Sequence, residues 1–278
     1  VFKTTDYGRT WTSVAGNLPM GSVNSIRQDP KNRNLLYAAA EFGFFISLND
    51  GQAWHQFMPN LPKVRVDEVV VHPRENDLIL ATHGYSIWIM DDISALQAMT
   101  PEALQAPVTL FQPREAVLWK TDRRLSTEIP GAKHWQGETA PRGTAITYHL
   151  SRPVSSARIT ITNTATGDAV RTCLGTTTAG LNRYQWTLTG DAAAGGGAGF
   201  AGRGGRGQAA EPAAPAPAGP QPCNTGAGGG GRGFGGGGGG RGGGGGGIGP
   251  GVYRVTLAID GKDVDSKTFT LLEDIWMK

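Results

Sequence analysis

Four side chains have types and positions that could serve a ligand or a reaction. Glu41 and Phe42 are neighbours, and His83 and Tyr85 form a similar pair further along the chain. A carboxylate such as Glu41 can act as an acid or accept hydrogen bonds from a carbohydrate, and an imidazole such as His83 can carry a proton. The alternative is structural, because both side chains could instead bond backbone groups in tight turns.

The sequence contains no complete catalytic set of a familiar type. It has no Gly-x-Ser-x-Gly elbow, no His-Glu-x-x-His motif and no Walker-type phosphate loop. A glycoside hydrolase needs two carboxylates, because one protonates the leaving oxygen while the other activates water or attacks. We therefore predict no catalytic residue, no metal site and no cofactor within this chain.

The elements that must position these side chains are strands joined by a repeated turn, whose second copy follows the first by 43 residues. The Asx side chain of such a turn can hydrogen-bond backbone amides, and its glycine can take a positive φ angle. The tryptophan that follows opens the next strand and can pack back under the turn. We expect the turns to be built by Thr4, Asp6, Gly8 and Trp11 in the first copy and by Ser47, Asn49, Gly51 and Trp54 in the second.

The repeat extends beyond the turn. Residues 23–30 recur as 66–73, and residues 34–39 recur as 77–82, with the same spacing of 43. A period of about 40–45 residues that carries four short strands is typical of a propeller blade. We therefore expect an all-β fold, with about two and a half four-stranded blades over residues 1–92. The expected strands are 1–4, 10–14, 22–28, 35–40, 44–47, 53–57, 66–71, 78–82 and 86–90.

The turn resembles the Asp-box, or BNR, repeat. In addition, Ala40-Glu41-Phe42-Gly43 and Thr82-His83-Gly84 resemble blades of the sortilin-like propellers found in bacterial proteins described as glycosyl hydrolases. The second turn has Ala53 where Thr or Ser is usual, and the third, at Asp91-Asp92, lacks the glycine and the tryptophan. The resemblance covers about residues 1–100 and implies a propeller whose Asp-box turns lie on the periphery. Glu41, Phe42, His83 and Tyr85 would then lie near the central channel.

The resemblance also bears on single positions and on completeness. The similar blades often carry Arg after His-Gly, where this chain has Tyr85, which argues against anion binding there. The first residues already match the third strand of a blade, and two and a half blades neither close a ring nor hide their edges. We expect the sequence to be the C-terminal part of a longer polypeptide whose upstream blades complete the ring. Export to the periplasm, cell surface or medium is implied by the resemblance alone.

Residues 93–142 break the repeat and are expected to form an exit segment and linker. Asp92 or Ser94 could cap a short helix, and Thr100 precedes a proline at a first helical position. The segments 108–111 and 116–119 again have the composition of extended chain. No apolar run in the sequence approaches the length of a membrane span.

Residues 143–278 predict a second all-β module, with strands at 145–150, 157–162, 170–173, 180–188, 251–257 and 265–271. Asp260-Gly261 is a two-residue hairpin signal. Short strands at this spacing are typical of a sandwich. The segments 166–171, 180–183 and 250–253 resemble the immunoglobulin-like module of the flagellar hook-capping type, which is commonly fused to secreted bacterial enzymes and propellers. We interpret Trp186 and Tyr253 as core and corner residues and not as a platform for sugars.

The sandwich is interrupted at 191–250 by a segment that holds 29 of the 43 glycines between Gly195 and Gly251. Such a composition buries nothing and costs the most backbone entropy to order, so we expect a disordered loop. Its Arg-Gly-Gly stretches could bind RNA through charge and stacking. This segment carries +2 of the net charge of +3, which leaves the rest of the chain close to neutral. The chain therefore lacks the basic footprint of a duplex nucleic-acid binder. Cys173 and Cys223 could form one disulfide or remain two thiols.

Three functions stay open from the sequence. The first is an exported binding or scaffold module that takes a peptide or glycan on the propeller face. The second is a glycoside hydrolase, of sialidase or xyloglucanase type, whose catalytic residues lie upstream. The third is RNA association through the glycine-rich loop.

Overall fold

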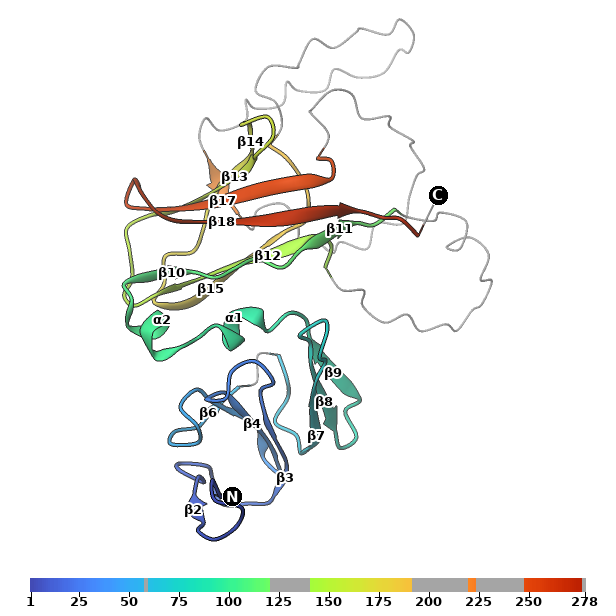
Figure 1. Cartoon of the computed structure of the whole chain (residues 1–278), viewed down its shortest axis with the longest axis vertical. Helices are drawn as coiled ribbons and strands as arrows, with labels where there is room; N and C mark the ends of the chain where they lie inside the picture. The colour runs from blue at the N-terminus through green and yellow to red at the C-terminus, as the bar shows by residue number, and fades with distance from the viewer. Residues whose placement is uncertain (58–59, 121–140, 192–219, 224–247, 277–278) are drawn as a thin grey trace, which may run out of the picture. The chain divides into compact units, whose positions relative to one another are not determined.

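The structure is a computed structural model that describes residues 1–57, 60–120, 141–191, 220–223 and 248–276 (Figure 1). The described residues are mostly β-strand and fall into two compact units. The first comprises Val1–Arg114 with Thr147–Ser151, and the second comprises Glu115–Ile146 with Arg152–Lys278. The all-β prediction is confirmed at this level.

The first unit is built from short antiparallel sheets that follow one another along the chain. Strands β1 (Phe2–Lys3) and β2 (Thr12–Ser13) form a two-stranded sheet. A four-stranded sheet has the order β3-β4-β5-β6, with β3 (Val23–Gln28), β4 (Leu36–Ala40), β5 (Gly43–Ser47) and β6 (His55–Gln56). A three-stranded sheet has the order β7-β8-β9, with β7 (Val66–Val71), β8 (Leu78–Thr82) and β9 (Ile87–Met90).

The registers show that these sheets are copies of one unit. Phe2 pairs with Ser13 in the first sheet, and Phe45 pairs with Gln56 in the second, 43 residues later on both strands. Strands β3 and β7 repeat as well, because each carries an irregularity in register directly after its first pair, at Val23 and at Val66. The two-stranded sheet therefore corresponds to β5 and β6 alone.

One detail of the predicted repeat is wrong. The sequence matches Leu35 to Leu78, a spacing of 43, but the pairing of β8 with β7 and β9 places Leu78 at the position of Leu36, a spacing of 42. The connection between β7 and β8 is one residue shorter than that between β3 and β4, and the next turn is one residue longer. Tyr37 thus corresponds to Ile79 and not to Leu80. The side chains that the sequence match would put on one face of β8 therefore lie on the other face.

The two larger sheets pack face to face. Tyr37, Phe44 and Ile46 on one sheet share a core with Val69 and Leu80 on the other. The opposite face of the four-stranded sheet buries Leu36, Ala38, Phe45 and Trp54 against Leu18 and Val23.

Two short helices follow the sheets. Helix α1 (Ser94–Gln97) has Ile93 at its N-cap. The two predicted cap residues, Asp92 and Ser94, lie on either side of it, so that prediction is wrong by one residue. Helix α2 (Pro101–Gln105) is capped as predicted, because the side chain of Thr100 accepts the backbone N–H of Ala103. Both helices are followed by β10 (Val108–Leu110).

The second unit holds most of the longer strands. A six-stranded sheet has the order β11-β18-β17-β13-β14-β16. A three-stranded sheet has the order β10-β12-β15, of which β10 and residues 147–150 of β12 are counted with the first unit. The bounds are β11 (Ala116–Leu118), β12 (Thr144–Leu150), β13 (Ala157–Asn163), β14 (Ala169–Leu174), β15 (Gly180–Trp186), β16 (Gln221–Pro222), β17 (Gly251–Ile259) and β18 (Lys262–Glu273).

An aromatic core lies between β15 and the six-stranded sheet. Trp186 lies 5.7 Å from Tyr253 and 5.8 Å from Phe269 between ring centroids, and all three are buried. The Tyr253 hydroxyl donates to the carbonyl of Gly249. The interpretation of Trp186 and Tyr253 as core residues is confirmed. The predicted hairpin forms at Asp260-Gly261, where both residues have positive φ.

Candidate functional site

Both predicted turns adopt the same hydrogen-bonded form. In the first, Thr4 Oγ1 accepts the N–H of Gly8 at 2.8 Å, and Asp6 Oδ1 accepts the N–H of Thr10 at 2.8 Å. The residues at Tyr7 and Gly8 both have positive φ, which an ordinary side chain rarely adopts.

The second turn repeats these contacts with different residue types. Ser47 Oγ accepts the N–H of Gly51 at 2.9 Å, and Asn49 Oδ1 accepts the N–H of Ala53 at 2.8 Å. Asp50 and Gly51 have the positive φ angles. The hydroxyl and Asx side chains of both turns therefore hold the backbone as predicted, and the two glycines take the positive φ angles.

The four predicted ligand residues lie in two turns at the same end of the first unit. Glu41 and Phe42 join β4 to β5, and the N–H of Glu41 donates to the carbonyl of Ser22, just before β3. His83 and Tyr85 lie between β8 and β9, and the N–H of His83 donates to the carbonyl of Arg65, just before β7.

The strands behind these turns are neighbours, which brings the turns to one end. The amide of Asn24 on β3 donates to the carbonyl of Val66 on β7 at 2.8 Å, and the hydroxyl of Ser25 donates to Glu68 at 2.8 Å. Further along, Arg27 lies 2.9 Å from Glu68 and donates to the carbonyl of Val69. Residues later in β3 contact residues later in β7, so the two strands run in the same direction and start at the same end of the unit.

Charged side chains surround this end in pairs. Arg65 donates to Asp67 Oδ1 at 2.6 Å, and Nδ1 of His83 lies 3.4 Å from Asp67 Oδ2. The hydrogen bond from Arg65, with its charge, holds the pKa of Asp67 below its usual range. The hydrogen bond from Ser25 and the charge of Arg27 lower the pKa of Glu68. These carboxylates are therefore ionised at neutral pH and suited to accepting hydrogen bonds.

A groove of about 930 Å³ opens beside the turn that carries Glu41 and Phe42. Its walls come from a turn, two strands and both crossovers between sheets, and its lining residues are Pro19, Phe42, Phe45, Gln56, Leu61 and Lys63. The volume lies in the range of ligand sites. Of the four predicted ligand residues only Phe42 lines it. Sequence reasoning missed Gln56 and Lys63, because their place in the groove depends on how a strand and a crossover of different sheets meet.

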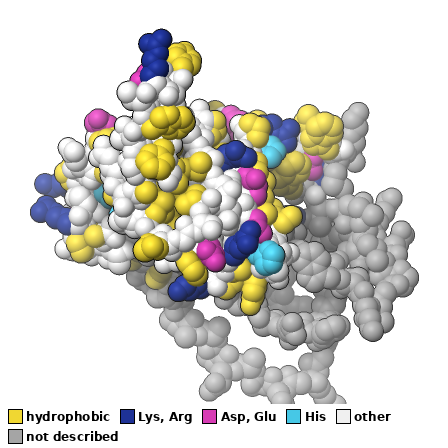
Figure 2. All heavy atoms as spheres, turned by 90° about the horizontal axis from the view of Figure 1, so that it is seen from below, with side chains coloured by type: hydrophobic (Ala, Val, Ile, Leu, Met, Phe, Trp, Pro, Cys, Tyr) yellow, Lys and Arg dark blue, Asp and Glu magenta, His cyan; other side chains and the backbone are white. Residues whose placement is uncertain are grey.

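The groove combines apolar and polar recognition. The ring of Phe42, which is 45 % exposed, can pack on an aliphatic side chain or on the apolar face of a sugar. The ammonium of Lys63 can donate hydrogen bonds to carbonyl, hydroxyl or carboxylate oxygens. Figure 2 shows hydrophobic side chains gathered on one face of the molecule, with charged side chains and histidine along its margin.

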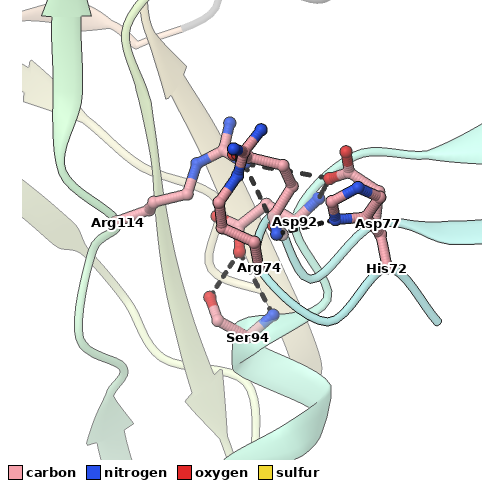
Figure 3. A network of polar contacts seen from close by, with 7 residues as sticks. His72, Arg74, Asp77, Asp92, Ser94 and Arg114 are labelled. Atoms are coloured by element: carbon pink, nitrogen blue, oxygen red, sulfur yellow. Dashed lines mark hydrogen bonds and ion pairs between the residues drawn. The ribbon is translucent and has the colours of Figure 1, made fainter.

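A further polar network in the first unit is structural (Figure 3). His72 Nδ1 accepts the N–H of Glu75 at 3.1 Å, and Asp77 Oδ1 accepts the N–H of Asp92 at 3.0 Å. Arg114 donates to the carbonyl of Glu75 and lies 3.8 Å from Asp77. These contacts fasten the segment after β9 to the turn between β7 and β8, so we assign them no ligand.

Asp29 holds the corresponding turn of the preceding sheet. It is buried, and its carboxylate accepts the backbone N–H groups of Lys31 and Asn32 as well as the hydroxyl of Tyr37 and the amide of Gln97. All its contacts are structural, so a buried carboxylate here is no sign of catalysis. Among the described residues, no group of His, Cys, Asp and Glu could hold a metal ion.

Cys173 and Cys223 form a disulfide in the second unit, which resolves the two pairing states that the sequence left open. It ties the end of β14 to β16, and the N–H of Cys223 also donates to the carbonyl of Leu174. The predicted RNA-binding arginines, Arg203, Arg206, Arg232 and Arg241, lie outside the described residues, as does most of the loop 191–250. The described helices include none that is long and apolar enough to cross a membrane.

No family model, curated protein or solved structure matches this chain. The candidate site therefore rests on its geometry, namely two turns at one end of neighbouring sheets and a groove beside the first of them.

Proposed function

We propose that the first unit is part of a sortilin-like, Asp-box β-propeller, and that the second is an immunoglobulin-like sandwich. The four-stranded meander β3-β4-β5-β6, the recurrence of its register and the two equivalent turns support the first assignment. Two sheets that enclose the Trp186, Tyr253 and Phe269 core support the second.

The protein acts as a binding module that takes a peptide or a glycan at the turn end of the propeller. The observation that carries this function is the groove of about 930 Å³ between Phe42, Phe45 and Lys63. Crossovers and turns from successive sheets meet there, and such loops are where proteins on a rigid scaffold place their binding residues.

Export is part of the same proposal. A disulfide between Cys173 and Cys223 persists in an oxidising compartment and is rare in reducing ones.

The test is a binding screen of the 278-residue chain against an array of oligosaccharides and an array of extended peptides. A ligand found on either array is then measured with Phe42→Ala, for which we expect an affinity loss of about fivefold or more, because an aromatic contact of this kind contributes about 1 kcal/mol or more. Tyr7→Ala is the matched control, because Tyr7 is an exposed aromatic residue in the peripheral turn. An equal affinity of the Phe42→Ala variant and the unmodified chain would refute the groove as the site.

A further inference from the structure

Two tryptophans of the second unit differ from the other described tryptophans. Trp119 is 51 % exposed and Trp276 is 81 % exposed. Their indole N–H groups have no hydrogen-bond partner among the residues that the structure describes. In the other four described tryptophans the indole N–H donates to a backbone carbonyl, namely in Trp11, Trp54, Trp88 and Trp186. Trp119 and Trp276 therefore combine an exposed ring with an unused donor.

The two tryptophans follow strands that lie side by side. Strand β11 pairs in parallel with β18, with Leu118 opposite Glu273, so both strands stop at the same end of the six-stranded sheet (Figure 1). Trp119 is the first residue after β11, and Trp276 is the third residue after β18. The sheet thus brings two exposed indoles to one end of the second unit.

A buried carboxylate fixes both chain segments where the strands stop. Asp274 is 2 % exposed, and its Oδ2 accepts the backbone N–H of Lys120 at 3.0 Å. Its Oδ1 accepts the backbone N–H of Trp276 at 3.0 Å. The peptide group after Trp119 and the peptide group before Trp276 therefore adjoin one carboxylate. Charge-assisted hydrogen bonds of this kind are the strong ones, so both tryptophans extend from a backbone that is held in place beyond the sheet.

A charged pair lies on the same two segments. Lys120 Nζ is 3.9 Å from Glu273 Oε1, and both side chains are exposed. An exposed pair at this distance is weakly bound, so both groups can also bond a ligand. The ammonium donates hydrogen bonds, and the carboxylate accepts them. A pyranose needs this combination, because its C–H face packs on an indole while its hydroxyls bond polar side chains.

The charged pair also decides between a sugar and a protein as the occupant. An apolar protein surface would exclude water from Lys120 and Glu273, and taking charges out of water is expensive. A polysaccharide replaces that water with hydroxyl groups. Leu272 and Ile275 are exposed at the same end, so a second copy of the chain is the competing occupant that the experiment must separate.

We propose that Trp119 and Trp276 form a platform that binds the pyranose rings of a neutral polysaccharide, with Lys120 and Glu273 bonding its hydroxyls. Asp274 is the positioning residue that holds the two segments. The site lies within the second unit and depends neither on the propeller assignment nor on the groove at Phe42. It attaches the protein to a polysaccharide, whatever ligand the first unit takes.

The experiment is a calorimetric titration of the 278-residue chain with cellohexaose, xylohexaose and mannohexaose. We expect at least one of them to bind. Trp119→Ala and Trp276→Ala should each weaken that binding by about fivefold or more, because each removes a stacked ring. Trp276→Phe keeps an aromatic face and loses only the N–H donor, so it should weaken binding less than Trp276→Ala.

The matched control is Trp11→Ala, which removes an exposed tryptophan from the peripheral turn of the first unit. It should leave the affinity unchanged. Circular dichroism should show the same thermal midpoint for the unmodified chain, Trp119→Ala and Trp276→Ala, because both side chains are largely in water. A loss of affinity at an unchanged midpoint then belongs to the platform and not to unfolding.

Three results would overturn the proposal. The first is no binding of any of the three oligosaccharides at millimolar concentration. The second is binding that survives the loss of both tryptophans and disappears in Phe42→Ala, which would assign the sugar to the groove. The third is self-association in sedimentation velocity that Trp276→Ala abolishes, because a second copy would then occupy the platform. Since the groove is tested by Phe42→Ala and the platform by the tryptophans, a failure of one proposal is distinguishable from a failure of the other.

Discussion

The two Asx turns of the first unit have the same internal hydrogen bonds and opposite surroundings. Trp54 is 2 % exposed, and its indole N–H donates to the carbonyl of Val14, the residue that follows β2. Trp11 is 61 % exposed, and its indole N–H reaches only the carbonyl of Gly8 within its own turn. The turn is therefore a local structure, whereas the burial of its tryptophan depends on a neighbouring sheet.

The same contrast separates the faces of the two larger sheets. Equivalent positions are buried on the sheet that has a neighbour on that side and bare on the sheet that does not, as Ile46 and Ile89 show. Stability in this unit is thus a property of pairs of copies and not of one copy, as in other repeat proteins.

The largest effect is expected at the tryptophans. Trp54→Ala should lower the free energy of unfolding by about 3–5 kcal/mol, because it empties a buried site. Trp11→Ala should cost about 0.5 kcal/mol or less, because the ring is mostly in water. Urea denaturation followed by circular dichroism measures both, and equal losses would contradict the contrast.

The next effect compares the two equivalent isoleucines. Ile46→Ala should cost about 2–5 kcal/mol, since it leaves a cavity between the sheets. Ile89→Ala should change the stability by no more than about 0.5 kcal/mol. The same denaturation series serves, and a large loss at position 89 would mean that the face is not bare.

A smaller difference is expected for the hydroxyls that hold the turns. Ser47 is fully buried, so Ser47→Ala leaves the N–H of Gly51 without its acceptor and should cost about 1–3 kcal/mol. Thr4→Ala leaves the N–H of Gly8 to bond water and should cost about 0.5 kcal/mol. Thermal midpoints of the two variants, measured side by side, test this order.

The smallest effect concerns pH. Hydrogen bonds from the backbone and hydroxyl of Thr10 lower the pKa of Asp6 to about 2. Because the folded pKa is depressed, the contribution of Asp6 to the turn is complete above its ordinary value of 3.8 and is lost as the pH falls through about 2. Asn49 has no such titration. An NMR titration should show the Thr10 amide shifting in this range and the Ala53 amide not shifting with a carboxyl pKa, and a Thr10 midpoint near 4 would contradict the assignment.

The sequence located the strands of the first unit well, because Asx, glycine and tryptophan recur at fixed positions and specify the turn locally. It missed the shift of one residue in β8, since Leu35-Leu36 offers two matches to Leu78 and only the pairing of strands decides between them. It could find Phe42 as an exposed aromatic in a turn but not Lys63 or Gln56. Their contribution depends on how crossovers from different sheets meet, and no local pattern records that.

In the second unit the alternating apolar residues and the Asp260-Gly261 turn predicted the strands. The disulfide stayed open at the sequence level, because the pairing of Cys173 with Cys223 depends on β16 lying beside β14. The long segment between them gives no signal of that position.

The central claim, that covered and bare copies of one sheet coexist in this chain, is tested most directly by hydrogen–deuterium exchange of the 278-residue chain at neutral pH. Strand β5 pairs on both edges and is covered on both faces, whereas β9 is an edge strand whose Ile87 and Ile89 lie in water. The account predicts that amides of β5 exchange about a hundredfold more slowly than those of β9, because opening of β9 breaks far fewer contacts. Equal protection of the two strands would contradict it.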